Sequence, residues 1–192
     1  MHGISIQYIM STEKKPKVQD TIENQQLEDR TIFLWGAVDD KTARHVVDRL
    51  MYLDALNHDE IKFYINSPGG YVTSGFSIYD TIKQIKSPVS TICTGLAASM
   101  GSLLLSVGEK GRRFIQPHAR VMIHQPSGGA QGQASDIEIT AQEILKTKEI
   151  SAKILADNCG QSYDKIMKDF QRDHWMDAAQ SVTYGIVDGV LE

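Results

Sequence analysis

The chain has 192 residues, a formal net charge of −4 and two cysteines. This length suits one domain with a full hydrophobic core, so we expect it to fold without metal ions or disulfides. The acidic balance offers no basic surface for nucleic acid, and no apolar run approaches the length that spans a membrane. Because the start lacks a signal-peptide pattern and Cys93 and Cys159 lie far apart, we expect a cytoplasmic protein with reduced thiols.

Residues 1–29 differ from the rest of the chain. A weakly alternating start is followed by a polar stretch, which buries too little apolar surface to fold by itself. We predict a flexible arm here, or a loop that a partner orders.

From residue 31 onward, apolar runs typical of strands alternate with segments of helical periodicity. This order predicts an α/β fold with a parallel sheet and crossover helices. The expected strands are 31–35, 61–66, 89–94, 112–115 and 120–124, and the expected helices are about 41–56, 74–85 and 99–108.

The longest predicted helix begins at Ser135 and is stopped by Gly160. Ser135 and Glu138 have the spacing of a capping box. At about 1.5 Å per residue this helix reaches on the order of 35 Å, which exceeds the width of a small domain. We expect one end to project and to contact another subunit; the alternative is a helix that lies flat across its own sheet.

Ser99 is the first candidate functional residue. It lies in the sequence GLAASMGS, residues 95–102, between a predicted strand and an apolar helix. Small neighbours let another chain approach its hydroxyl, and the start of a helix offers free N–H groups to a developing anion. These features suit acyl transfer, although a serine in a tight strand-to-helix turn is an equal alternative.

A nucleophilic serine needs a base, which is normally a histidine held by a carboxylate. His124 stands out among the six histidines because it closes a predicted strand just before Gln125 and Pro126, where a loop begins. A structural role for a lone histidine at a strand end is the alternative reading.

Spacing does not choose the carboxylate. Asp173 is favoured weakly, because it links two predicted helical segments and lies beside Arg172 and an aromatic residue, which could keep it dry and ionised. A surface ion pair or helix cap is the alternative. The aspartates that follow His124 are Asp136, Asp157, Asp164, Asp169, Asp173, Asp177 and Asp188.

Gly69 and Gly70 follow a predicted strand and leave backbone N–H groups unobstructed. Such a turn can donate to an oxyanion, but it is also common in crossovers and phosphate cradles. Since neither G-x-x-x-x-G-K-[ST] nor G-x-G-x-x-G is present, we do not expect a nucleotide site.

Together these motifs resemble those of the Clp protease proteolytic subunits (ClpP). This family consists of serine peptidases of the crotonase-like superfamily. The resemblance runs from about residue 29 to the end of the chain. The motifs that carry it are INSPGG (65–70), GLAASMG (95–101), RVMIHQP (120–126), GQASDIEI (132–139), RD (172–173) and YGIVD (184–188).

The resemblance implies a role for each motif. The implied triad consists of Ser99 as nucleophile, His124 as general base and acid, and Asp173 as orienting carboxylate. The backbone N–H groups of Gly70 and Met100 would form the oxyanion hole. Substrate contacts are expected from the flanking residues Gly69, Gln125 and Pro126.

The resemblance also implies an architecture and partners. We expect a crotonase-like fold of repeated strand-strand-helix units over residues 30–192, with the helix at about 135–158 as a projecting handle. Residues 1–29 would be an arm or axial loop and a candidate for partial processing. Heptamers would stack into a tetradecamer that hydrolyses unfolded proteins and peptides. An AAA+ unfoldase such as ClpX, ClpA or ClpC would use ATP, while the peptidase itself needs no cofactor or metal.

Two features depart from the family pattern. The usual aliphatic-proline start is absent, and Lys62 and Gln84 stand where the docking pocket for the unfoldase commonly has aromatic residues, although Tyr64 is kept. Desolvating such polar groups on docking is unfavourable. We therefore hypothesise a second ClpP paralogue in a mixed assembly. The alternatives are a weakly active or non-catalytic ring subunit, and a crotonase-type acyl-CoA enzyme on the same fold.

Overall fold

The computed structural model describes residues 17–191, and its elements follow the predicted alternation of strands and helices from residue 31 onward. The predicted boundaries lie within a few residues of the observed ones. In chain order the elements are α1 (Val18–Glu28), β1 (Thr31–Trp35), α2 (Asp40–Leu56), β2 (Ile61–Ser67), α3 (Val72–Gln84), β3 (Val89–Ala98), α4 (Met100–Ser106), β4 (Arg113–Ile115), β5 (Arg120–Ile123), α5 (Ala134–Cys159), α6 (Tyr163–Asp169), β6 (His174–Met176), α7 (Ala178–Tyr184) and β7 (Gly189–Val190).

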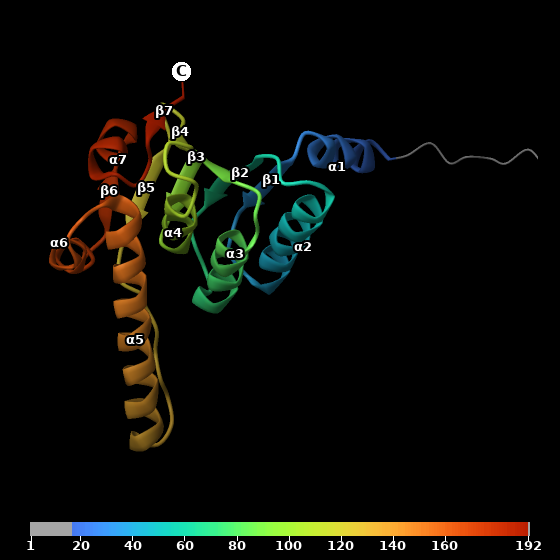
Figure 1. Cartoon of the computed structure of the whole chain (residues 1–192). Coiled ribbons are helices and arrows are strands. Elements are labelled where there is room, and N and C mark those ends of the chain that lie inside the picture. The colour runs from blue at the N-terminus through green and yellow to red at the C-terminus, as the bar shows by residue number, and fades with distance from the viewer. Residues whose placement is uncertain (1–16, 192) are drawn as a thin grey trace, which may run out of the picture.

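The predicted parallel sheet is confirmed along β1-β2-β3-β4-β7 (Figure 1), an order that the sequence did not predict. Strand β3 is longer than expected, because its first half pairs with β4 and its second half, Leu96–Ala98, pairs with β5. The short strand β6, which was not predicted, pairs antiparallel with β5. The end of β3 therefore lies beside the strand that ends in front of His124.

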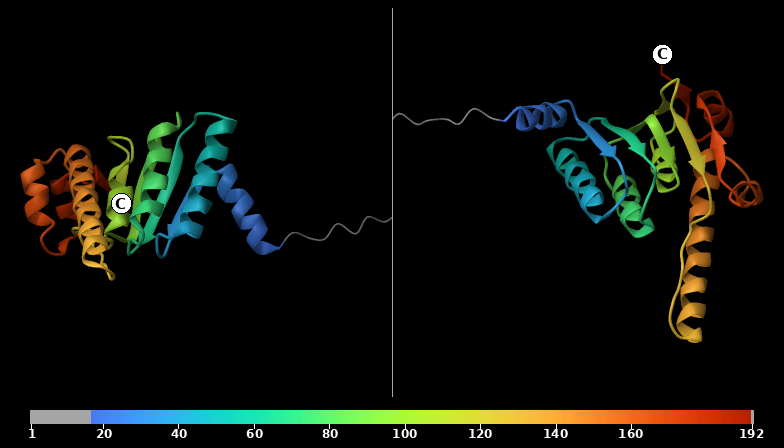
Figure 2. Two further views of the ribbon diagram at one scale, coloured as in Figure 1. Left: turned by 90° about the horizontal axis from the view of Figure 1, so that it is seen from below. Right: turned by 180° about the vertical axis from the view of Figure 1, so that it is seen from behind.

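The core lies between the sheet and the helices α2, α3 and α4, which cover one face of it (Figures 1 and 2). Alternate residues of the strands point into this core, as Ile32 and Phe63 do. On the other face Phe33 and Tyr64 stack with their ring centroids 5.2 Å apart. None of the helices within residues 17–191 combines the length and apolar character needed to cross a membrane.

Helix α5 projects from the domain, as predicted, so the alternative of a helix lying flat is wrong (Figure 1). It has 26 residues, which corresponds to about 39 Å. Its buried residues all lie between Ser151 and Cys159, and Gly160 ends it in the left-handed conformation. The predicted capping box is wrong: Gln133 is the N-cap without a side-chain hydrogen bond, because the helix begins before Ser135.

The N-terminal segment is partly helical. Polar composition predicted an arm or loop, yet Val18–Glu28 form α1, so the prediction of an irregular segment is wrong for these residues. Glutamine, glutamate and leucine are good helix formers even where little apolar surface is buried. Residues 1–16 of the predicted arm lie outside the described residues.

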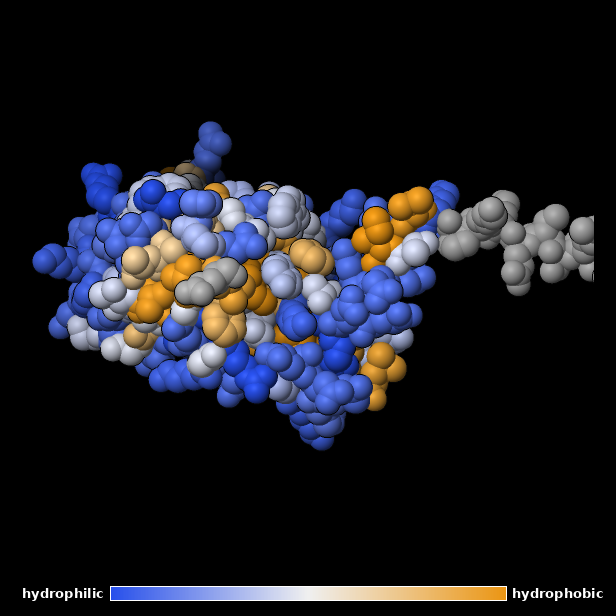
Figure 3. All heavy atoms as spheres, turned by 90° about the horizontal axis from the view of Figure 1, so that it is seen from above, coloured by the Kyte–Doolittle hydropathy of each residue, from blue (hydrophilic) through white to orange (hydrophobic). Residues whose placement is uncertain are grey.

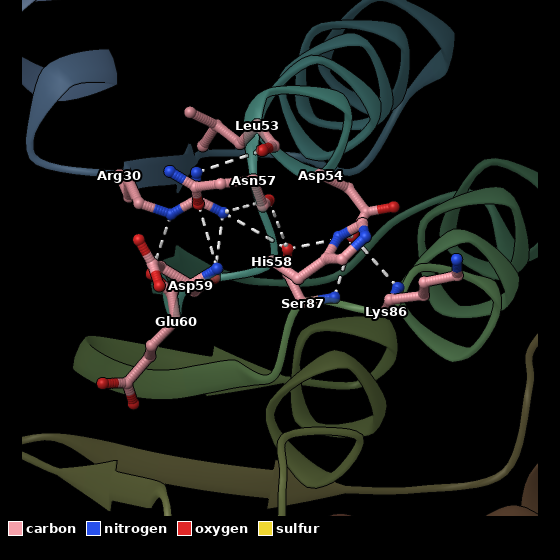
Figure 4. Close-up of polar contacts among 9 residues, drawn as sticks. All are labelled: Arg30, Leu53, Asp54, Asn57, His58, Asp59, Glu60, Lys86 and Ser87. Atoms are coloured by element: carbon pink, nitrogen blue, oxygen red, sulfur yellow. Dashed lines mark hydrogen bonds and ion pairs between the residues drawn. The ribbon is translucent and has the colours of Figure 1, made fainter.

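Arg30 ties the end of α1 to the end of α2 and to the loops that precede β2 and β3 (Figure 4). It has a positive φ of 51° and directs its guanidinium under the C-terminal end of α2. There the side chain also donates to the Ser87 hydroxyl, 3.2 Å away, in front of β3. The guanidinium thereby adds a donor to the Leu53 and Asn57 carbonyls at the end of α2, which also accept from the Asn57 N–H and the Ser87 hydroxyl. The carbonyl oxygens that accept from it belong to Leu53, Asn57, Asp59 and Glu60.

Apolar side chains also reach the surface. Seen from above, they gather around the end of the chain and on α1 (Figure 3). Val18 and Ile22 of α1 are exposed. The hollow at the end of the chain is lined by Gly95, Gln116, Pro117, His118, Ala119 and Leu191.

Candidate active site

Ser99 lies at the sharp turn between β3 and α4. Its φ of 53° and ψ of −122° are rare for a residue other than glycine, so the surrounding hydrogen bonds must hold this strained conformation. The Ser99 N–H donates to the Met122 carbonyl at 2.8 Å, and the Ser99 carbonyl accepts from the Ser102 hydroxyl at 2.6 Å. The backbone is thus fixed on both sides at this strand-to-helix turn, as on a nucleophile elbow.

The triad predicted from the resemblance is assembled. His124 Nε2 is 2.9 Å from Ser99 Oγ, and His124 Nδ1 is 3.1 Å from Asp173 Oδ1. The pairing of β5 with β6 explains why these residues meet: Ile123 lies opposite His174, so the next pair along the two strands is His124 and Asp173. The register of β5 and β6 therefore identifies Asp173 as the aspartate beside His124, which spacing along the chain could not do.

Asp173 is not held dry, contrary to the sequence-based interpretation. Its side chain is 58% exposed, and its ion-pair partner among residues 17–191 is His124, not Arg172. The reason is its place in the surface connection between α6 and β6. The expected link between two helical segments also contains the strand β6, whose three residues are too few for a periodic signal.

The turn after β2 packs directly against Ser99. A Cβ atom at Gly69 would lie 2.7 Å from the Ser99 Cβ and 2.9 Å from the Met100 nitrogen, so a side chain has no room there. Two hydrogen bonds hold this turn to Val38, whose N–H donates to Gly69 and whose carbonyl accepts from Tyr71. Val38 was not recognised as a site residue, because no local signal marks it.

The Gly70 and Met100 N–H groups are the two predicted oxyanion donors. Within the described chain, neither the Gly70 N–H nor the Met100 N–H donates to another group. A Cβ atom on Gly70 would overlap the Val38 carbonyl, so only glycine lets this segment approach so closely. The two predicted oxyanion donors therefore remain available to an anion that forms at Ser99.

A small pocket opens beside the triad. Its walls are mainly apolar, and the Ser102 and Ser151 hydroxyls add polar groups. The sequence predicted Pro126 as a substrate contact. It did not predict that residues of α3, α5 and the end of α6 line the same pocket, because no motif connects these segments. The pocket is lined by Val72, Ser99, Met100, Ser102, Leu103, Ile123, His124, Pro126, Ser151, Leu155 and Phe170.

Gln125 and Pro126 begin an extended segment that runs beside α5 (Figure 1). The Gln125 N–H donates to the Phe170 carbonyl at 3.1 Å, which joins this segment to the end of α6. Pro126 contacts the pocket on the other side. The structure thus brings Gln125 and Pro126 together with His124, and Gly69 lies against the Ser99 turn.

The model of the Clp protease family matches residues 13–192. The chain belongs to the Clp protease family. It is therefore a serine peptidase of the ClpP type, and the predicted ClpP fold is confirmed. Proteins of this family are oligomeric peptidases that work with unfoldases.

The cysteines of this Clp protease take no part in the site. Cys93 and Cys159 are buried and free. Burial raises the pKa of both thiols to about 12, so they remain protonated at neutral pH. The chemistry of the site therefore falls to oxygen and nitrogen groups.

Proposed function

We propose that this chain is the proteolytic subunit of an ATP-dependent Clp protease, an endopeptidase that hydrolyses unfolded polypeptides and peptides through Ser99. One observation carries the proposal: His124 lies within hydrogen-bond distance of both Ser99 Oγ, at 2.9 Å, and Asp173 Oδ1, at 3.1 Å. Nucleophile, base and orienting group thus form one chain of contacts.

In the first half of the reaction His124 Nε2 accepts the Ser99 proton while Oγ attacks the peptide carbonyl carbon. The carbonyl electrons move onto oxygen, and the N–H groups of Gly70 and Met100 stabilise this oxyanion. Each such donor contributes on the order of 3 kcal/mol to lowering the barrier. Histidine then gives the proton to the leaving amine, and the acyl group stays on Oγ.

In the second half His124 accepts a proton from water, and the resulting hydroxide attacks the acyl-enzyme. Collapse of the second tetrahedral intermediate returns the proton to Ser99 and releases the new carboxylate. Asp173 accepts from Nδ1 throughout, which keeps Nε2 free for the serine and stabilises the imidazolium. The chain needs no cofactor or metal for these steps.

The substrate would lie between the Gly69 turn and the segment of Gln125 and Pro126. An extended peptide there places its carbonyl over Ser99 and one side chain in the pocket. Leu103, Leu155 and Phe170 line that pocket, so it favours an apolar side chain over a charged one.

Assembly into heptamers stacked as a tetradecamer is supported by the projecting half of α5. Ile139 and Leu145 lie there with 60% and 59% of their surface exposed. Apolar side chains on a projecting helix favour burial against another copy of the chain. The triad would then line an inner chamber into which an AAA+ unfoldase such as ClpX, ClpA or ClpC delivers unfolded chains.

A second candidate function is a weakly active or non-catalytic ring in a mixed assembly with another ClpP paralogue. Two observations favour it. The Asp173 side chain is largely exposed, and Lys62 lies exposed beside Tyr64 on the strand β2, where docking would have to desolvate its charge. The acyl-CoA alternative has no comparable support, because the Ser99–His124–Asp173 arrangement serves a covalent acyl-enzyme.

Labelling with a fluorophosphonate, combined with native mass measurement, tests these candidates. The full chain is labelled alone and then together with the second peptidase subunit of its source. We expect one label per chain at Ser99, none in Ser99→Ala, and the same assembly mass for both proteins. Labelling only in the mixed assembly would support the second candidate. Labelling that persists in Ser99→Ala would overturn the assignment of the nucleophile.

A further inference from the structure

The segment that carries Asp173 has few contacts of its own. Residues 171–173 are exposed, and within the described chain His124 is the hydrogen-bond partner of the Asp173 carboxylate. The position of this carboxylate therefore depends on how the chain is held on either side. One side is Asp169, where α6 ends, and the other is His174, where β6 begins.

Tyr184, the last residue of α7, contacts both sides. Its hydroxyl donates to Asp169 Oδ2 at 2.9 Å, and its ring packs against the His174 ring with the centroids 5.5 Å apart. Lys165 strengthens the first contact, since its Nζ lies 2.6 Å from Asp169 Oδ2 and 4.4 Å from the centre of the Tyr184 ring. One buried tyrosine thus connects the two residues that flank the exposed segment.

The charges in this cluster keep the contact in place. Burial opposes ionisation of Asp169, but the hydrogen bonds from Lys165 and Tyr184 outweigh it and lower the pKa of Asp169. Burial, together with the bond to the Asp169 carboxylate, raises the pKa of Tyr184. At neutral pH the tyrosine therefore keeps its proton and donates it to an ionised acceptor, which makes a strong hydrogen bond.

The end of α6 also reaches the substrate pocket. Phe170 follows Asp169 directly, its ring is buried in the pocket wall, and its carbonyl accepts from the Gln125 N–H at 3.1 Å. A movement of Asp169 would therefore pass along the chain toward Asp173.

We propose that Tyr184, acting through Asp169 and His174, is a positioning residue that sets the place of the Asp173 carboxylate relative to His124. The proposal rests on the proposed function, because it requires Ser99, His124 and Asp173 to act as a triad. Tyr184 does not touch substrate or reacting atoms, so its loss changes the alignment of Asp173 and not the chemistry itself.

The test uses Tyr184→Phe in the full-length protein, in the assembly that labels at Ser99, with hydrolysis of a short activated ester. A misplacement of 1 Å can cost on the order of 10²-fold in rate, so a partial loss of alignment should lower kcat about tenfold and leave KM nearly unchanged. Asp169→Asn, which keeps the shape of the side chain, should lower kcat in the same direction. Tyr79→Phe removes the hydroxyl of a half-buried tyrosine on α3, which does not flank the Asp173 segment, and it should leave kcat unchanged.

Repeating the test in the Asp173→Ala variant shows whether Tyr184 acts by positioning Asp173 or only by stabilising the fold. In Asp173→Ala there is no carboxylate to place, so adding Tyr184→Phe should cause no further loss of kcat. An equal loss in both backgrounds, or a wild-type kcat for a folded Tyr184→Phe, would overturn the inference. If instead the wild-type protein carries no label at Ser99, the proposed function itself fails. Thermal unfolding midpoints check that each variant is folded.

Discussion

Gly69→Ala tests the geometry of the oxyanion hole most directly. Gly69 has a φ of +91°, and its Cβ would lie 2.9 Å from the Met100 nitrogen and 2.7 Å from the Ala98 carbonyl oxygen. Both neighbours are backbone atoms, so they cannot swing aside as a side chain would. Either the added methyl group displaces the Met100 N–H, or the turn moves away from Ser99 and takes the Gly70 N–H with it.

Either movement removes one donor from the oxyanion. One donor contributes about 3 kcal/mol to transition-state stabilisation, which corresponds to a loss in kcat of roughly 10²-fold. The positive φ at an alanine adds a cost of about 1–2 kcal/mol to the folded state. Gly69→Ala should therefore lose most of its activity and a smaller part of its stability.

Gly111→Ala is the matched control. Its φ of +85° is similar, but no atom lies within 4 Å of the Cβ position, so it carries the backbone cost without the contact. The two variants are compared by kcat and KM on a peptide ester, by the rate of fluorophosphonate labelling, and by urea unfolding. The reasoning is refuted if Gly69→Ala keeps a kcat within about threefold of Gly111→Ala, since that difference is under ~1 kcal/mol.

Three further predictions follow from burial and charge. Asp173→Ala should lower kcat by roughly 10³–10⁴-fold with little effect on stability, because the side chain is 58% exposed; a loss below about tenfold would argue against its role. Phe170→Ala should destabilise the fold by about 3–5 kcal/mol in urea unfolding, because the ring is 1% exposed, and an unchanged midpoint would contradict that burial. Burial opposes ionisation of Asp188, but hydrogen bonds from Arg113 outweigh burial and lower the pKa of Asp188 below the ordinary 3.8. The ionised Asp188 therefore stabilises the fold at neutral pH, and this stabilisation is lost as the pH falls below 3.8. Asp188→Asn should therefore reduce stability at pH 7 and flatten its decline in acid, and parallel pH curves for the two proteins would exclude this.

Local sequence signals were sufficient where the site is built from short continuous segments. Small residues around Ser99 indicated an approachable hydroxyl, and two glycines after β2 indicated unobstructed N–H groups; the structure adds that Gly69 contacts the Ser99 turn. The place of His124 at the end of a strand was likewise visible, because strand ends can be found from alternation and turn residues.

The remaining parts depend on contacts between distant segments. Asp173 reaches His124 through the pairing of β5 with a strand of three residues, and Tyr184 reaches Asp169 from a separate helix. No period or motif in the chain encodes such contacts. The resemblance to a family supplied a role for Asp173, but it gave no role to Tyr184, although Tyr184 begins one of its motifs, and none to Phe170.

The two sides of this triad differ in how firmly they are held. Ser99 lies in a turn that buried strands, close glycines and backbone hydrogen bonds fix from all sides. Asp173 lies in an exposed segment, and its alignment depends on the contacts of Tyr184 at either end. Changes on the Ser99 side should therefore disturb fold and activity together, whereas changes on the Asp173 side should alter activity in a folded protein. A binding partner that covers residues 171–173 would act on this same side, so partner-dependent activity would appear as a rise in kcat with the nucleophile already in place.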